Sequence, residues 1–515
     1  MRGIQSTVLC LLAVNVDAFA RNGHGALGFA APLGVRAVRG LAFVQTQTSK
    51  LNGDRGSNGN ISKPAQQGRA AAGLQMTAAM SGGALPAQAA NPVPPQKGSE
   101  GSTVGRSTFN LIKNIVGAGI LAIPGGVNTF SQSRTALVPA IGLIVGLGSM
   151  SGYCFSLIGR VCAATGASSY GEAWSKTIGE KSSWLATSSC TAKTFFACMA
   201  YSIIVGDVFS EVLKAFGAKG LLASRSNVLC LVSASVLFPL CLLKDLSALS
   251  YTSILGVLGT VYTACVMGIR YFDRSYFEGG KFFAALSEES RPWFGGSGAL
   301  NPLALILLSM LSTAFVAHFN APKFYTDLKD KTVGRYNTVV ASSFGTAIAL
   351  VVVMTLFPFL TFGGASKGFI LNNYATTDVL ATTCRVAVAT SIVGGYPLVF
   401  MPAKNGALAL FGISNPTETQ RKVGTALLLA AFTAIGVTIT DLGFVVSFGG
   451  AVLGSALVFI FPAMMWITKC RQDVKSGKPP RGWRRLEMGA NYVVALLGVL
   501  LAVLGGGLSV KKTFF

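Results

Sequence analysis

Long apolar stretches are the feature that most constrains the fold of this chain. About eleven of them follow one another between residues 107 and 510, and most are close to 20 residues long. An α-helix rises about 1.5 Å per residue and a bilayer's hydrocarbon core is about 30 Å thick, so each stretch is long enough to cross a membrane. The whole chain is 51% hydrophobic and only 12% charged, which is too apolar for a soluble protein of 515 residues. We therefore predict an all-α integral membrane protein, embedded in the lipid bilayer through about eleven transmembrane helices.

The predicted spans are separated by short polar loops. We place them at 107–130, 137–158, 184–212, 227–243, 249–269, 301–325, 339–362, 379–402, 423–439, 442–467 and 491–510. Basic residues give the chain a net charge of +23, but they lie mostly before the first span and in the loops, without the basic-aromatic pattern of a nucleic-acid site. The ten cysteines form no CxxC pair. We predict no nucleic-acid partner, no metal site and no cofactor.

The first apolar stretch, Ser107–Phe130, is a poor continuous helix. Gly117 and Gly119 lie near its middle and Pro124 follows, and both residue types weaken helices. Interrupted spans are tolerated where the freed backbone lines a protein cavity, and in transporters such breaks bind substrate and ions. The alternative is a kinked helix whose glycines serve close packing. The sixth stretch is also irregular, and two breaks five spans apart are what two inverted five-span repeats would produce.

The first hundred residues have a different composition. Arg2 and a short apolar run that ends in VDAFA predict a signal peptide over 1–18, and the acid-poor sequence after it predicts a transit-peptide-like leader and disordered linker over 19–103. This two-part leader resembles those of algae with secondary plastids, which would place the protein in a membrane of the plastid system. The alternative is a signal anchor with a disordered tail, which would place it in a vacuolar or plasma membrane. The transporter domain is predicted over 104–511.

Six motifs resemble the amino acid/auxin permease family, which includes sodium-coupled neutral amino-acid transporters and proton-coupled vacuolar permeases. In chain order they are FNLIKNIVGAGILAIP (109–124), AYSIIVGD (200–207), PLCLLKDLSALSYTSILGV (239–257), STAFVAHFNAPKFYTDLKD (312–330), YPLVFMPAK (396–404) and DLGFVVSFGGAVLGSALVFIFPA (441–463). The resemblance implies amino-acid substrates. It also implies a leucine-transporter-like fold of two inverted five-helix repeats plus one extra helix.

The resemblance also implies where the substrate binds. The segment Val116, Gly117, Ala118 and Gly119 aligns with the unwound part of the first span, which should hold the substrate's α-carboxylate and amine. Backbone N–H groups suit a carboxylate, and glycine permits close approach. In the sixth span the matching residues are Ser312, Thr313, Ala314 and Phe315. The alternatives are packing glycines and a Phe315 that belongs to the core.

Coupling residues follow from the same alignment. Lys113, with Asn114 beside it, stands where sodium-coupled members use an asparagine in the sodium site, and Thr390 and Ser391 match the other half of that site. An ammonium group there would repel Na⁺, so we predict proton coupling and keep sodium as the alternative. Lys113 could instead extend to the membrane interface. His318 could carry protons or cap the inner part of the sixth span.

We therefore predict a secondary active amino-acid transporter. A non-transporting amino-acid sensor of the same fold is the second hypothesis. An enzyme is the least favoured class, because the only histidines are His24, in the leader, and His318, and no HExxH motif occurs.

Overall fold

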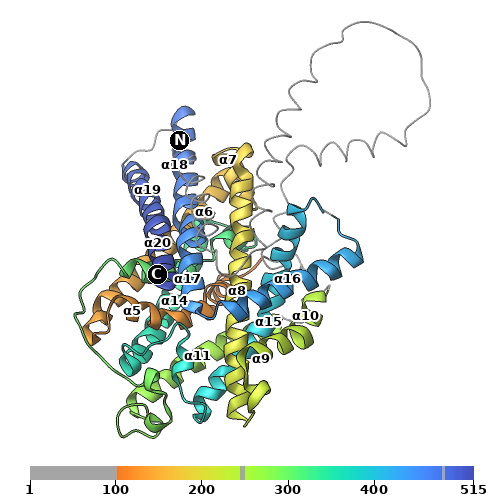
Figure 1. Cartoon of the computed structure of the whole chain (residues 1–515). Coiled ribbons are helices and arrows are strands. Elements are labelled where there is room, and N and C mark those ends of the chain that lie inside the picture. The colour runs from red at the N-terminus through yellow and green to blue at the C-terminus, as the bar shows by residue number, and fades with distance from the viewer. Residues whose placement is uncertain (1–100, 244–249, 414, 478–481) are drawn as a thin grey trace. The chain divides into compact units, whose positions relative to one another are not determined.

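The computed structural model describes residues 101–243, 250–413, 415–477 and 482–515. The predictions for residues 1–100 lie outside these residues. The regular elements of the described part are helices, and only two isolated β-bridges, Ser102–Leu328 and Trp293–Gly363, occur there. The described chain therefore has the predicted all-α class (Figure 1).

The helices follow the predicted spans closely. Their bounds are α4 (Val104–Ile115), α5 (Ile123–Phe130), α6 (Leu137–Thr165), α7 (Tyr170–Thr177), α8 (Ser183–Ala215), α9 (Arg225–Val232), α10 (Phe238–Leu242), α11 (Ser250–Phe272), α12 (Ala304–Ala314), α13 (Ala321–Thr326), α14 (Val333–Phe362), α15 (Val379–Leu410), α16 (Glu418–Thr438), α17 (Leu442–Gly449), α18 (Phe461–Lys475), α19 (Trp483–Leu500) and α20 (Gly506–Phe514). Short π-helical turns join α9 to α10, α17 to α18 and α19 to α20, so each of these pairs forms one span.

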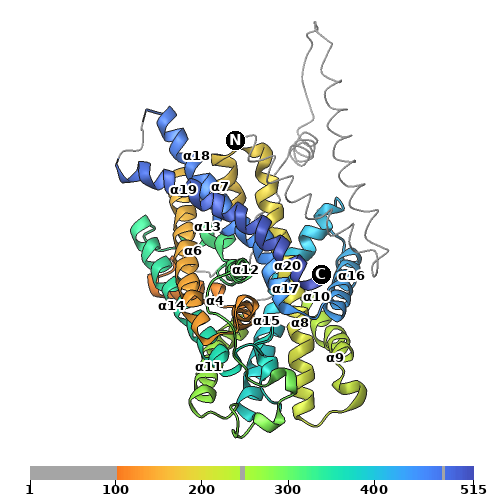
Figure 2. The same ribbon diagram turned by 60° about the vertical axis from the view of Figure 1, so that its left-hand side comes forward.

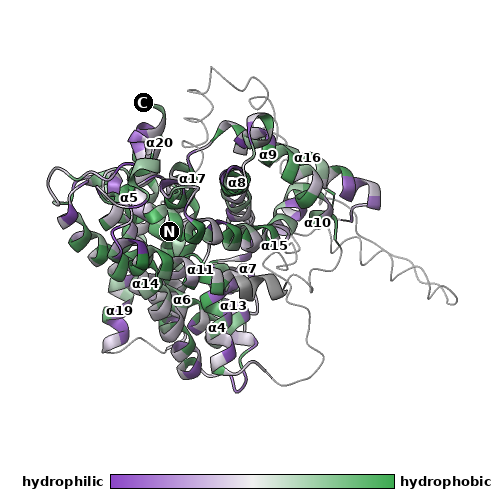
Figure 3. Ribbon diagram, turned by 90° about the horizontal axis from the view of Figure 1, so that it is seen from below, coloured by the Kyte–Doolittle hydropathy of each residue, from purple (hydrophilic) through white to green (hydrophobic). Residues whose placement is uncertain are grey.

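Most of these helices are long and apolar enough to cross a membrane. Within the described residues nine pass this test, and the bent pair α4–α5 makes a tenth. The 23-residue α11 lies at the position of the predicted fifth span and is not among these ten. Hydrophobic residues predominate along the helices, as the green colour in Figure 3 shows. The chain is a multi-pass membrane protein.

Local sequence explains where several helices begin and end. The Thr103 side chain accepts a hydrogen bond from the Arg106 N–H and so caps the start of α4. Thr417 and Gln420 form a capping box at the start of α16. Gly166, with a positive φ of 67°, ends α6 in the left-handed conformation that glycine adopts without strain.

The two interrupted spans occupy the middle of the helix arrangement. α4 packs against α14, while α12 packs against α5, α6 and α17. α15 packs against α8 and α11. Figure 2 shows α4 and α12 near the centre, with α6 and α14 on one side and α8 and α17 on the other. The breaks therefore fall where several long helices meet. They interrupt the first and the sixth span, which agrees with the predicted fold of two five-helix repeats.

Candidate functional site

The first span is interrupted where the sequence predicts. α4 ends at Ile115, Val116 and Gly117 are extended, and a 3₁₀ turn begins at Ala118. The Val116 N–H still donates to the Ile112 carbonyl at 2.7 Å, and the Ile120 N–H donates to the Gly117 carbonyl at 3.2 Å. The two halves of the span are bent by 44°. The segment Val116–Gly119 is thus the turning point between two half-helices.

The two glycines of this segment have open space beside them. Gly117 has φ −122° and ψ 177°, which any residue adopts, so its conformation does not require glycine. A side chain at this position is therefore compatible with the unwound backbone. A Cβ built on Gly117 meets nothing within 4 Å, and one on Gly119 meets only the Thr313 methyl carbon, at 3.8 Å. What glycine provides here is access to the backbone.

The break in the sixth span lies slightly later than predicted. α12 continues through Ala314, and the interruption covers Phe315–Ala317. Ser312, Thr313 and Ala314 therefore form the last turn of α12, where the Ser312 hydroxyl donates to the Leu308 carbonyl at 3.0 Å. Such a bond to the preceding turn is made within a helix, which it often bends.

Phe315 is fully buried in the break of the sixth span. The tip of its ring lies 3.0 Å from the place of a Cβ on Gly148 of α6. Phe315 therefore packs on the second span. This contact agrees with the alternative in which Phe315 belongs to the core.

Thr313 joins three spans at the level of the breaks. Its hydroxyl donates to the Val446 carbonyl of α17 at 2.8 Å and accepts from Lys193 Nζ of α8 at 3.5 Å. Gly450 makes the approach of the tenth span possible, because a Cβ there would lie 1.8 Å from the Ser309 carbonyl oxygen. The sequence places Lys193 inside the third span, but it does not reveal that Lys193 reaches the sixth.

The ends of the two interrupted spans are also tied together. The Ser102 N–H donates to the Asp327 carbonyl at 2.7 Å, and the Lys329 N–H donates to the Ser102 carbonyl at 2.9 Å. The start of α4 is therefore fixed to the segment that follows α13. This pairing couples the position of the first half of one broken span to the second half of the other.

The predicted coupling residues are not all brought together. Lys113 and Asn114 lie, half-buried, in the last turn of α4. In α15, Thr390 is exposed and donates to the Val386 carbonyl at 2.9 Å, while Ser391 points at Gly256 of α11. Among the contacts recorded for the described residues, none joins Lys113 or Asn114 to Thr390 or Ser391.

His318 is a buried link between the sixth and second spans. Its side chain has no exposed surface, and Nε2 lies 2.9 Å from the Ser151 carbonyl, to which it donates. The ring packs edge-on against Phe155, with 5.6 Å between the ring centroids. This bond joins His318 to the second span and is not the helix cap that the alternative expected.

A cavity of about 120 Å³ lies toward the α5 side of the breaks. Its lining includes Asn128, Met310, Asp441 and Lys512, from the first, sixth, tenth and eleventh spans. Neither Thr313 nor Lys193 is among its lining residues. The cavity is therefore distinct from the place where Thr313 contacts Lys193 and Val446.

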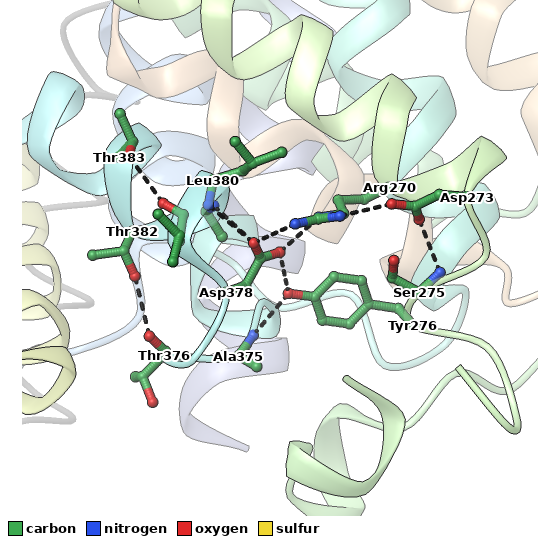
Figure 4. A network of polar contacts seen from close by, with 12 residues as sticks. Arg270, Asp273, Ser275, Tyr276, Ala375, Thr376, Asp378, Leu380, Thr382 and Thr383 are labelled. Carbon is green, nitrogen blue, oxygen red and sulfur yellow. Dashed lines mark hydrogen bonds and ion pairs between the residues drawn. The ribbon is translucent and has the colours of Figure 1, made fainter. Parts of the chain in front are cut away.

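A second polar cluster surrounds Asp378 at the start of α15 (Figure 4). The fully buried Asp378 carboxylate accepts two hydrogen bonds from Arg270, at 2.6 and 2.8 Å, and one from the Tyr276 hydroxyl at 2.8 Å. It also accepts from the Leu380 N–H at 3.0 Å and so caps α15. Burial, and then the negative charge of Asp378, raise the pKa of Tyr276, so its phenol stays protonated and donates. The cluster fastens α11 and the following loop to α15.

We expect Asp378→Asn to destabilise the protein by about 3–5 kcal/mol, because removing one partner of a buried ion pair leaves the other charge uncompensated. Thermal unfolding of the full chain in detergent measures the effect. Asp273→Asn is the matched control: Asp273 also pairs with Arg270, at 2.7 Å, but it is 33% exposed and should contribute at most about 1 kcal/mol. Equal shifts for the two variants would contradict this assignment.

Comparison with known proteins gives a consistent result. The family model described as "Transmembrane amino acid transporter protein" matches residues 100–510. Sodium-coupled neutral amino acid transporter 7 of Rattus norvegicus is 24% identical over 440 residues, which are 81% of this chain and 88% of that protein. Amino acid transporter AVT6E of Arabidopsis thaliana is 25% identical over 428 residues, 79% and 83% of the two chains.

Among solved structures, MhsT in complex with L-phenylalanine is similar with a TM-score of 0.49 and 13% identity, covering 79% of this chain and all of that one. The family model covers most of the chain, including both interrupted spans. This chain therefore belongs to the transmembrane amino acid transporter family.

Proposed function

We propose that this protein is a secondary active transporter that moves amino acids across its membrane by alternating access. The observation that carries the proposal is the meeting of the two interrupted spans, where Gly119 of the first lies beside Thr313 of the sixth. The open backbone at Gly117 would receive the α-carboxylate and amine of the substrate. The backbone tie between Ser102 and Lys329 supports a joint movement of α4 and α13.

We further propose that transport is coupled to protons and independent of sodium. Support comes from Lys113 in the last turn of α4, where the free carbonyls and the negative end of the helix dipole stabilise a cation. Within the described residues, no carboxylate forms an ion pair with Lys113. An ammonium group at this place would take the role of a bound metal cation.

Sodium coupling is the second candidate. Several of the relatives that match this chain are named as sodium-coupled neutral amino acid transporters or symporters, which favours it. Asn114, beside Lys113, is a neutral oxygen donor of the kind a sodium site needs.

A panel of labelled amino acids separates these proposals. The full chain in proteoliposomes would be tested first with an inward sodium gradient and then with an inward proton gradient. We expect saturable uptake with the proton gradient, unchanged when choline replaces sodium. Uptake that requires sodium would favour the second candidate, and binding without uptake would favour a sensor.

A further inference from the structure

Lys193 is a buried cation without a buried anion. Its side chain is 7% exposed, in the middle of the apolar helix α8. The one hydrogen bond recorded for its ammonium group is the 3.5 Å contact to the Thr313 hydroxyl. That hydroxyl is neutral and donates its own hydrogen bond to the Val446 carbonyl. In the parts of the chain that the structure describes, no aspartate or glutamate forms an ion pair with Lys193.

An unpaired ammonium group inside a membrane protein is costly, and such groups are found where they serve substrates or ions. Three arginines in the described part of the chain have their charge satisfied. Arg225 pairs with Asp207, Arg270 pairs with Asp378, and Arg385 donates to several backbone carbonyls. Lys193 and Lys404 differ from these arginines, because each donates to a neutral threonine hydroxyl, at 3.5 and 3.3 Å, and only Lys193 lies beside the breaks. An anion is what the ammonium group of Lys193 lacks among these contacts.

The position of Lys193 indicates which anion could pair with its ammonium group. Thr313 contacts Lys193 through its hydroxyl, and its methyl group lies beside Gly119. The ammonium group is therefore one threonine side chain away from the backbone segment assigned to the α-carboxylate and amine. An amino acid bound by its α groups at that segment would have its side chain close to Thr313 and, through Thr313, close to Lys193.

We propose that Lys193 binds an anionic group at the end of the substrate's side chain, so that the protein selects acidic amino acids. This inference rests on the proposed transport function. A carboxylate there satisfies the ammonium charge, a neutral side chain leaves it unpaired, and a cationic side chain meets like-charge repulsion. The Thr313 hydroxyl contacts the ammonium group without neutralising its charge.

Competition in the wild-type protein is the first test. Glutamate and glutamine, or aspartate and asparagine, differ in side-chain charge at nearly constant shape. In proteoliposomes with the full chain, we expect glutamate to inhibit uptake of a transported amino acid at a concentration at least ~30-fold lower than glutamine, the effect of one buried charge pair. Equal inhibition, or stronger inhibition by glutamine, overturns the inference and leaves amino-acid transport intact. If no amino acid accumulates, the proposed function itself fails.

Substitution of the lysine is the second test. We expect Lys193→Gln to reduce the glutamate preference to less than ~3-fold while glutamine uptake continues, and Lys193→Arg to retain the preference because the charge remains. Lys404→Gln is the matched control. Lys404 is also buried and also donates to a threonine, Thr425, at 3.3 Å, but toward the end of α15 and outside the breaks.

The control should keep the wild-type ratio of glutamate to glutamine uptake. An unchanged ratio in Lys193→Gln overturns the inference, and so does an equal loss of both substrates, which would make Lys193 structural. If Lys193→Gln does not reach the membrane, the wild-type competition and Lys193→Arg still decide, since both must show the acidic preference.

Discussion

Gly117→Val is expected to abolish amino-acid binding while the protein remains folded and inserted. A Cβ on Gly117 meets no protein atom within 4 Å, and its extended backbone suits a β-branched residue. The valine therefore fits the empty protein but fills the space through which the substrate reaches the backbone. Loss of the charged contacts to the α-carboxylate should cost about 2–5 kcal/mol, or roughly 30-fold or more in affinity. Equilibrium binding of a transported amino acid to detergent-solubilised protein measures this loss.

Two other glycines of the first span provide controls. Gly105 of α4 is equally open, so Gly105→Val should leave binding nearly unchanged. Gly126 of α5 has the Met310 sulfur 2.7 Å from its would-be Cβ, so Gly126→Val should lower the unfolding temperature instead. If Gly117→Val bound the amino acid with wild-type affinity, Gly117 would not be part of the binding site and would serve helix packing. A thermal shift as large as that of Gly126→Val would mean that folding, and not the site, is affected.

Lys113→Asn is expected to make uptake depend on sodium. Two unit charges about 4 Å apart repel by ~4 kcal/mol at an effective dielectric constant of ~20, which an ordinary sodium site could not offset. Removing the ammonium group lifts this repulsion and supplies an amide oxygen, a ligand that a hard cation accepts. We expect wild-type uptake at fixed pH to be unchanged when choline replaces sodium, and uptake by Lys113→Asn to fall at least tenfold.

The control for this exchange is Lys181→Asn, an exposed lysine between α7 and α8, which should behave as the wild type. If Thr390 and Ser391 complete the sodium site in another conformation, Ser391→Ala added to Lys113→Asn should weaken the acquired sodium dependence. Wild-type uptake that collapses without sodium would refute the assignment of Lys113.

The sequence was most informative where the signal is local. The length of each apolar stretch locates the helices. Gly117, Gly119 and Pro124 locate the first break to within a residue or two, because glycine and proline each weaken a helix within one turn of backbone. The sixth span has no such glycine pair. The interruption there was predicted at Ser312–Phe315 and lies at Phe315–Ala317, because a hydroxyl residue such as Ser312 can also stand inside a helix, bonded to the preceding turn.

The contacts that complete the site could not be predicted from the sequence. Lys193 and Thr313 are 120 residues apart, and their meeting depends on how α8 and α12 are rotated about their axes. The same holds for Asp378 and Arg270, 108 residues apart. Lys193 did carry a recognisable signal, a lysine inside an apolar span, but only packing reveals which span it faces.

Concentrative uptake is the most direct test of the central claim, that this chain transports amino acids by a coupled, alternating-access mechanism. The full-length protein would be reconstituted in proteoliposomes with an inward proton gradient, choline in place of sodium, and a labelled amino acid at equal initial concentration on both sides. We expect the internal concentration to rise above the external one, to collapse when a protonophore removes the gradient, and to remain unchanged in Gly117→Val. Binding of the amino acid by the wild type without any accumulation, under either a proton or a sodium gradient, would contradict the account.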